Sequence, residues 1–333
     1  MRLDAGNWRA MVTRYQKADV RRAVFQLVNT LVPLAAMMYL MYVSLAWSYW
    51  ITLALAVPTA GFLVRTFIIM HDCGHGSFLP SQRWNNIVGW VTGVLTATPY
   101  GEWRHEHAIH HATAGDLDRR GHGDIATITV DEYLARGWWG RLRYRLYRNP
   151  LLMLGVGPLY MLFGQRIPGR VHSSGSPKTS SVWSTNLGMA VLLTGLSMVV
   201  GLQPVLLVYL PVAYLAGGAG VYLFYVQHQF DDAYWERHAD WDYVTAAVMG
   251  CSHLKLPKVL QWFTGNIGLH HVHHLAPRIP NYTLQRAHDE NPIFDKAPTF
   301  SLARSARMLR LALWDEQRGR MIGFGDLRAP QRA

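Results

Sequence analysis

The sequence predicts an all-α membrane protein with four transmembrane helices in two hairpins, and a cytoplasmic helical cap that carries histidine clusters. The membrane part is predicted by two stretches, residues 23–64 and residues 179–230, which contain no Asp, Glu, Lys or Arg. Each stretch is long enough for two membrane-spanning helices of about 20 residues. Overall, 16% of the 333 residues are charged, against roughly 25% in soluble domains.

The chain is expected to form one domain in five regions. These are the interfacial N-terminus (1–22), the first hairpin (25–70), a region with two histidine clusters (71–183), the second hairpin (184–226) and a region with the third cluster (227–333). The four spans are predicted at 25–45, 51–70, 184–201 and 204–226.

Some segments are predicted not to cross the membrane. Residues 86–100 and 151–164 are apolar but too short for a span, so they are expected to be interfacial or re-entrant, with a buried cap helix as the alternative. Residues 1–22 are basic and predict a short helix on the membrane surface. A Ser- and Gly-rich loop is expected at 173–177.

The distribution of basic residues predicts the orientation. Arg and Lys crowd the N-terminus, the central region and the C-terminus, and are absent from the tight turns around Ser48 and Gln203. By the positive-inside rule, the three basic regions face the cytoplasm, as expected for an inner or plasma membrane protein. Nucleic-acid binding is the competing use of a net charge of +11, and we do not expect it in so apolar a chain.

Three histidine clusters have the spacing of one helix face. One is an HxxxH pattern and two are HxxHH patterns; their members are His71 and His75, then His107, His110 and His111, then His270, His273 and His274. Residues at i, i+3 and i+4 are neighbours on a helix surface, so each cluster can present its imidazoles together as part of a metal site. Solvated helix ends are the alternative interpretation.

The span count also predicts that the clusters meet. His71 ends the second predicted span and His228 follows the fourth. Two complete hairpins bring both residues to the same side of the membrane as the two HxxHH clusters. A further span at residues 86–100 would separate His71 from the others, which is why that segment is not counted.

The number of histidines indicates more than one metal ion. Imidazole is a ligand for Zn, Cu, Fe and Ni, so ligand type alone does not select the metal. A structural zinc takes four protein ligands and a catalytic zinc usually three, so eight or nine imidazoles suit two ions. The spans contain no Glu-x-x-His pair, which excludes the carboxylate di-iron pattern of helical bundles.

The cluster sequences resemble those of the integral-membrane fatty-acyl desaturases, and most resemble the acyl-lipid Δ12/ω-6 branch. The motifs are HDCGH at 71–75, WRHEHAIHH at 103–111 and GLHHVHHLAPRIPNY at 268–282, and the resemblance extends over about residues 61–288. It implies an O2-dependent enzyme with two iron ions that introduces a cis double bond into the acyl chains of membrane lipids. Because no cytochrome b5 domain with its His-Pro-Gly-Gly motif is fused, the resemblance implies a separate soluble electron donor, ferredoxin or cytochrome b5.

The resemblance also implies the iron ligands. They fall on His71, His75, His107, His110, His111, His270, His273 and His274, with His228 as the best candidate for a further ligand outside the clusters and His105 as the next.

Other polar residues near the clusters are candidates for orienting the imidazoles rather than binding metal. They are Asp72, His105, Glu106, Asp231, Asp232 and His271. Asp231 and Asp232 are expected to act on the second ring nitrogen of His228. Asp116, Asp118 and Asp124 could also orient imidazoles, but a role as loop cap or solvated charge is the favoured interpretation.

Two other functions are compatible with parts of this pattern. A related di-iron hydroxylase or ketolase, acting on alkanes or carotenoids, would share the metal ligands and differ in its substrate pocket. A membrane metal transporter or store would require ionisable residues within the spans, and the predicted spans contain almost none.

Overall fold

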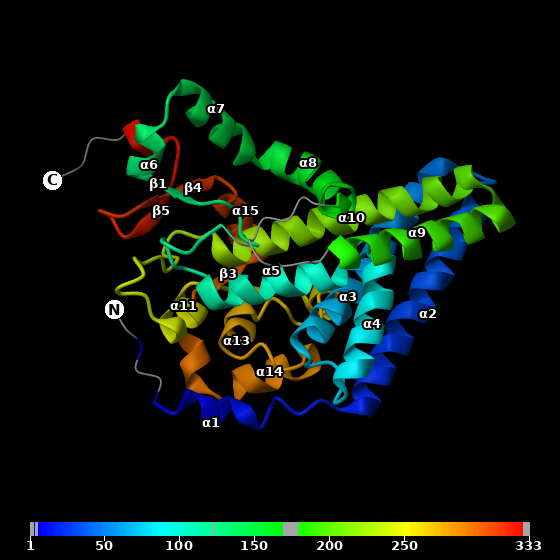
Figure 1. Ribbon diagram of the computed structural model, residues 1–333, viewed down its shortest axis with the longest axis horizontal. Coiled ribbons are helices and arrows are strands. Elements are labelled where there is room, and N and C mark those ends of the chain that lie inside the picture. Colours follow the sequence, from blue (N-terminus) through cyan, green and yellow to red (C-terminus); the bar gives the residue numbers. More distant parts are fainter. Residues whose placement is uncertain (1–2, 4–5, 122, 169–178, 329–333) are drawn as a thin grey trace.

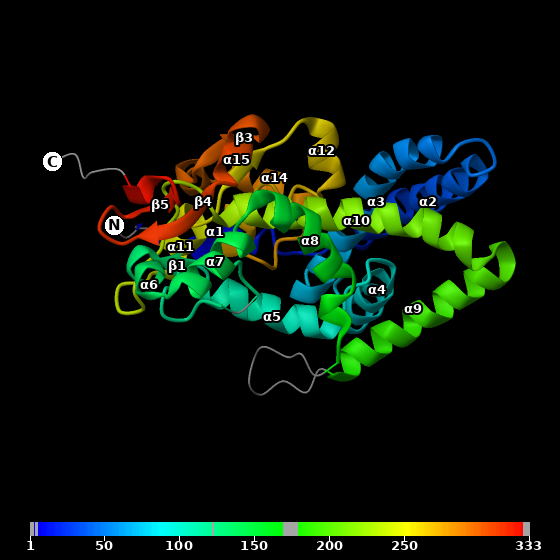
Figure 2. The ribbon, with the colours of Figure 1, turned by 90° about the horizontal axis from the view of Figure 1, so that it is seen from above.

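The computed structural model describes residue 3 and residues 6–121, 123–168 and 179–328. Four helices in these ranges are long and apolar enough to cross a membrane, which confirms the predicted fold class. They are α2 (Val20–Ser44), α3 (Tyr49–His75), α9 (Thr179–Val200) and α10 (Leu202–His228). In both ribbon views the turns that join α2 to α3 and α9 to α10 lie on one side of the molecule. The strands and most of the short helices lie on the other side (Figures 1 and 2). The loop expected at 173–177 lies outside the described residues.

Each pair of long helices is joined by a tight turn. Ser48 caps α3, and its side chain accepts a hydrogen bond from the Trp50 amide. The buried hydroxyls of Ser44 and Thr52 lie 2.7 Å apart across this turn. Gly201 alone separates α9 from α10, at a φ of 88° that side chains disfavour. Both hairpins therefore have their turns at one end and their open ends at the other.

The two shorter apolar segments form helices that line the bundle without crossing it. These are α4 (Gln82–Leu95) and α8 (Pro150–Leu162). The α4 helix packs along α3. Along α8, Met153 packs near Leu223 of α10, and Leu162 packs near Val208. The α8 helix therefore runs antiparallel to α10, beginning near the end of α10 that carries His228.

The rest of the chain builds the cap from short elements. The helices are α1 (Trp8–Thr13), α5 (Tyr100–Thr113), α6 (Val130–Ala135), α7 (Trp138–Tyr147), α11 (Tyr243–Met249), α12 (Lys258–Phe263), α13 (His270–Leu275), α14 (Asn281–Asp289) and α15 (Leu302–Met308). Single 3-10 turns lie at η1 (Gly164–Arg166), η2 (Pro292–Lys296) and η3 (Asp326–Arg328).

Five short strands among the described residues connect segments of the cap, and the sequence does not predict them. They are β1 (Ile128–Thr129), β2 (His253–Lys255), β3 (Thr299–Ser301), β4 (Leu311–Asp315) and β5 (Arg320–Gly323). β4 pairs with β1 in parallel and with β5 in antiparallel orientation, and β2 pairs with β3 in parallel. Strands of two to five residues carry little periodicity, and most of these pairings join segments far apart in sequence.

The N-terminal segment forms a short helix, as predicted, and packs against the cap. Val12 and Tyr15 are buried in the cap core, with residues of α11, α13 and α14. The Tyr15 hydroxyl donates a hydrogen bond of 2.7 Å to Glu290. These two side chains therefore pack against protein, and the position of residues 1–22 on the membrane surface stays a prediction.

Candidate metal centre

The structure brings nine histidines together in two adjacent groups at the cap end of the bundle. In each group, one ligand atom from every residue lies within 4.8 Å of those of the others. The five-histidine group contains His71, His75, His107, His111 and His273, and the four-histidine group contains His110, His228, His270 and His274. Rings of the two groups stack on each other, with the His111 and His274 centroids 4.1 Å apart.

Helical geometry determines how each HxxHH cluster is divided. On α5, the i and i+4 residues His107 and His111 belong to the five-histidine group, and the i+3 residue His110 belongs to the other. On α13 the division is reversed, because the i and i+4 residues His270 and His274 belong to the four-histidine group. Each of these helices therefore contributes to both groups.

The ends of two membrane-spanning helices supply the remaining histidines. His71 and His75 lie on the last turn of α3, which ends at Gly76 in a left-handed conformation with a φ of 67°. His228 is the last residue of α10. The four-histidine group would have three members without His228.

The distances between ring nitrogens fit coordination of a common ion. In the five-histidine group, the Nε2 atoms of His71 and His107 are 3.1 Å apart, and those of His111 and His273 are 3.0 Å apart. In the other group, Nε2 of His228 lies 3.2 Å from Nε2 of His110 and 2.9 Å from that of His270. Imidazole nitrogens about 2.1 Å from a metal are roughly 3.0–3.4 Å apart at octahedral or tetrahedral angles.

The protonation state and unpaired nitrogens also suit metal ions. Burial, together with neighbouring imidazoles, lowers the pKa of His107, His111 and His273 well below the ordinary histidine value. Neutral imidazoles have the free lone pair that a metal requires. The Nε2 atoms of His75 and His274 are buried without a hydrogen-bond partner in the described part of the chain. Two metal ions would satisfy these atoms.

Two aspartates orient ligand rings through the opposite nitrogen. Asp72 lies 3.1 Å from Nδ1 of His71 and accepts hydrogen bonds from the backbone and side-chain amides of Asn281. Asp124 contacts Nδ1 of His110. The interpretation of Asp124 as a solvated charge was therefore wrong; its place in a loop 14 residues after His110 gave no local signal of this contact.

The expected partners of His228 also differ. Its Nδ1 lies 3.7 Å from the buried Cys251 thiol. Asp231 is instead near Arg320 at 3.9 Å, and Asp232 is exposed. No hydrogen bond joins Asp231 or Asp232 to His228 within the described ranges.

The other candidate residues lie outside both groups. His105 and Glu106 are half-buried on the outer part of α5. His271 is fully buried, but its Nε2 lies 3.2 Å from Nδ1 of His288, away from the metal groups.

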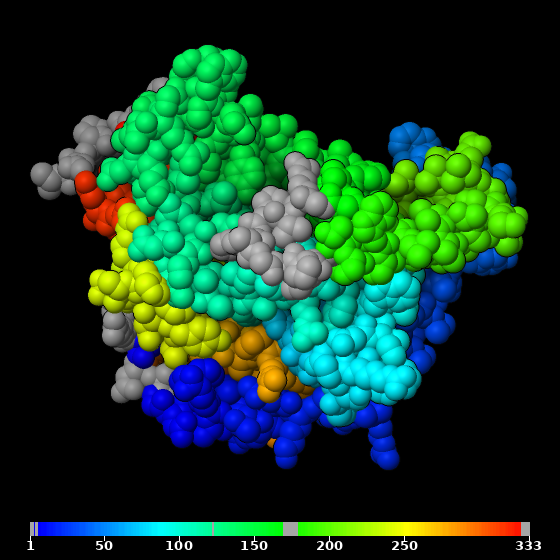
Figure 3. All heavy atoms as spheres, in the orientation of Figure 1, coloured from blue at the N-terminus to red at the C-terminus, as the bar shows by residue number. Residues whose placement is uncertain are grey.

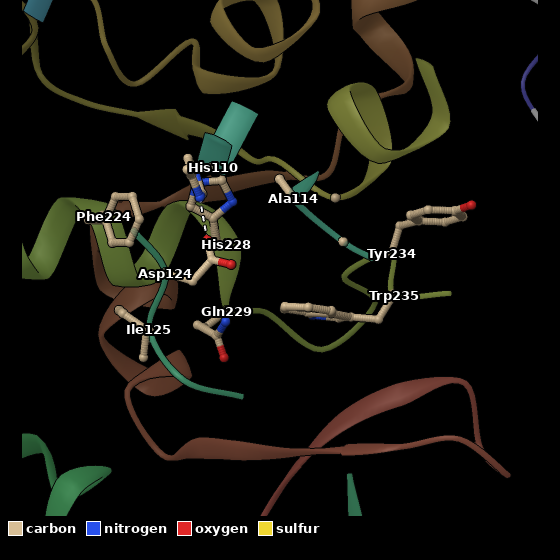
Figure 4. A pocket seen from close by; sticks show the side chains of 11 residues that line it. His110, Ala114, Asp124, Ile125, Phe224, His228, Gln229, Tyr234 and Trp235 are labelled. Atoms are coloured by element: carbon tan, nitrogen blue, oxygen red, sulfur yellow. Dashed lines mark hydrogen bonds and ion pairs between the residues drawn. The ribbon is translucent and has the colours of Figure 1, made fainter. Parts of the chain in front are cut away.

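A small cavity opens beside the four-histidine group. It has a volume of about 20 Å³ and is lined by residues that include His110, Asp124, His228 and Gln229. Figure 4 shows the Asp124 carboxylate directed at His110, with Trp235 and Tyr234 on the far side of this space. A cavity of this volume has room for one water-sized molecule.

The fold and site thus define a polytopic membrane protein with two adjacent histidine groups that could each hold a metal ion. Comparison with known proteins identifies the family: residues 45–304 match the fatty acid desaturase family, and the chain belongs to it. The resemblance of the three motifs to membrane desaturases is confirmed.

Several relatives are themselves desaturases. The chain is 46% identical over 315 residues to a fatty acid desaturase of Bacillus subtilis (strain 168), covering 94% of this chain and 89% of the relative. It is 31% identical to an sn-2 acyl-lipid omega-3 desaturase (ferredoxin) of Helianthus annuus, covering 66% of this chain and 51% of the relative. It is 29% identical to an acyl-lipid omega-3 desaturase (cytochrome b5) of Arabidopsis thaliana, covering 66% and 58%. The chain therefore spans just over half the length of these plant relatives.

Proposed function

We propose that this chain is an oxygen-dependent di-iron desaturase that introduces a cis double bond into acyl chains of membrane lipids. The observation that carries the proposal is the division of nine histidines, eight of them buried, into groups of five and four at the ends of two membrane-spanning helices. The overall reaction removes two hydrogens from adjacent methylenes, and O2 with two electrons and two protons leaves as two waters.

The residues of the chain have definite parts in this reaction. The two histidine groups hold two iron ions, which supply the oxygen-activating and hydrogen-abstracting chemistry when bound. Asp72 and Asp124 fix the rings of His71 and His110, as carboxylates commonly do for metal-ligating imidazoles. Burial of the rings keeps bulk water from the reacting atoms.

The double-bond position is a finer proposal. The resemblance around residues 268–282 favours Δ12/ω-6 desaturation of a monounsaturated chain. The plant relatives described above carry the name omega-3 desaturase, so an ω-3 product is the first alternative. Their names also pair them with ferredoxin or cytochrome b5, and we propose a soluble donor of this kind here.

The orientation follows from the two hairpins. Because both consist of an even number of spans, the basic N-terminus, the cap and both histidine groups share one side. By the positive-inside rule this side is the cytoplasmic face of an inner or plasma membrane. The acyl chain then enters from the lipid, and the electron donor docks from the cytoplasm.

Fatty-acid profiling of a host that lacks its own desaturase tests this function. Cells that express the full chain with a competent electron donor should accumulate new cis-unsaturated acyl chains in their lipids, and cells that express His270→Ala should not. The purified chain should hold two irons after anaerobic loading. Hydroxylated alkanes or oxygenated carotenoids would instead indicate the hydroxylase or ketolase alternative. Bound metal without any lipid product would indicate a metal-binding protein.

A further inference from the structure

The α7 helix exposes a stripe of large apolar side chains. Trp138, Leu142 and Leu146 follow one another at i, i+4 and i+8 and are 64%, 36% and 48% exposed. Trp139 is 63% exposed, and its ring stacks on Trp138 with centroids 3.9 Å apart. In Figure 3 the region of α6 and α7 forms the ridge at the top of the molecule. A contiguous exposed patch of this kind marks an interaction site.

The opposite side of α7 is fixed to the cap. Tyr144 is 4% exposed, and its hydroxyl donates a hydrogen bond of 2.6 Å to the carbonyl of Ala312 on β4. Arg145 Nε donates a hydrogen bond of 2.6 Å to the Tyr133 hydroxyl. The stripe therefore has a defined direction and cannot turn inward without breaking these contacts.

Basic side chains flank the stripe and lack acidic partners. Arg136, Arg141, Arg143 and Arg145 lie within ten residues, and none forms an ion pair with a described residue. By contrast, the exposed Arg237 elsewhere in the cap pairs with both Asp118 and Glu316. The surface of α7 thus combines apolar groups with uncompensated positive charge.

The stripe continues into the lipid-facing surface of the bundle. Only Arg148 and Asn149 separate α7 from α8, and Asn149 caps α8 by accepting hydrogen bonds from the first backbone amides. The buried Arg148 fixes this junction through a hydrogen bond of 2.7 Å to Gln229. The α8 helix lies along membrane-spanning α10, and its outward residues, such as Leu151 at 84%, are highly exposed. The α7 helix therefore leaves the bundle where the lipid-facing surface reaches the cap.

We propose that α7 binds the surface of an anionic phospholipid bilayer. Trp138, Trp139, Leu142 and Leu146 insert at the level between headgroups and acyl chains, and Arg143 contacts phosphates. Tryptophan at the interface and arginine at headgroups are the usual composition of interfacial helices. A second copy of this chain is disfavoured as the binding partner of α7, because the arginines of the two surfaces would repel each other. This inference does not depend on the proposed reaction.

Spin labels can test the depth of α7 in full-length protein in lipid nanodiscs. Both native cysteines are fully buried, so a label on Leu142→Cys reports on one position. Its accessibility to oxygen and to a water-soluble nickel complex should resemble that of Leu151→Cys on α8. Ala239→Cys, which is exposed in the loop before α11, should show the profile of an aqueous site. A Leu142 label as water-exposed as the Ala239 label would overturn the proposal.

The charge component needs a second comparison. In nanodiscs with an anionic lipid, Arg143→Gln should shift the bound-to-free ratio of α7 by about fivefold. In purely zwitterionic nanodiscs this variant should match the parent. An equal effect in both lipids would refute recognition of anionic headgroups. A Leu142 label that is immobilised only when an acidic ferredoxin is added would assign the surface to a protein partner instead.

Discussion

Replacement of His228 by alanine is the sharpest test of the metal centre. His228 is the single contribution of α10 to the site, and its Nε2 lies 3.2 Å and 2.9 Å from the ligand atoms of His110 and His270. Removing it leaves three histidines in one group and all five in the other. We therefore expect iron content to fall from two to about one ion per chain. Loss of a residue that only orients a ligand costs about 10–100-fold, so loss of a ligand should reduce product by more than about 100-fold.

The assay combines iron analysis of the purified, anaerobically loaded chain with fatty-acid profiling of the expressing cells. His238→Ala is the matched control, since His238 is exposed and pairs with Asp116 at 2.8 Å, outside both histidine groups. The control should keep two irons and near-normal product. Thermal unfolding of both variants separates loss of metal from loss of fold. A folded His228→Ala variant with two irons and normal product would show that the assignment is wrong, and His105 would become the next candidate.

Three further predictions concern residues around the centre. Asp124→Asn should lower product or iron affinity by about 10–100-fold in the assays above, because the amide no longer offers His110 a carboxylate; an unchanged variant would contradict the orienting role. Asn281→Ala should lower stability by about 1–3 kcal/mol in thermal unfolding, since its side chain bonds to both Asp72 and Gln26; an unchanged melting temperature would argue against this network. Burial is the main cause that lowers the pKa of His253 from 6.5 to about 4. As the pH falls, the unfolded chain therefore protonates His253 at a higher pH than the folded chain does. The corresponding stability is present above pH 6.5 and lost as pH falls toward 4. The metal-free His253→Gln variant should lose less stability over this range than the metal-free parent, and parallel curves would refute the assignment.

The membrane frame could be predicted because its signals are local. Absence of charge over 40 residues or more is a property of continuous sequence. The turn around Ser48 lies where it is predicted, whereas the turn predicted around Gln203 lies at Gly201, because α10 begins at Leu202. The predicted spans end too early, because α3 continues to His75 and α10 to His228. The cap histidines are thus built into the last turns of these helices. Hydropathy misses such turns because their residues are polar although the backbone is still helical.

Convergence of the histidines could also be anticipated, whereas their division into two groups could not. The spacing places His107, His110 and His111 on one side of α5, but the angle between α5 and α13 decides which ring meets which. Likewise, the contact of Asp124 with His110 depends on a loop that folds back over α5, and that of Cys251 with His228 depends on the chain after α10. These are tertiary contacts with no periodic signal in the sequence.

The geometry of the two HxxHH helices explains why the histidines form two groups rather than one. A helix places the i and i+4 imidazoles about 40° apart around its axis and turns the i+3 ring by about 100° from the i+4 ring. The histidine rings of α5 and α13 face each other. His110 of α5 therefore joins the His270 and His274 pair of α13, and His273 of α13 joins the His107 and His111 pair of α5. Each helix therefore links both groups, and the hairpins complete them, with His71 and His75 from α3 on one side and His228 from α10 on the other. A shift of either short helix would disturb both groups at once, which makes the relative position of α5 and α13 the main determinant of the site.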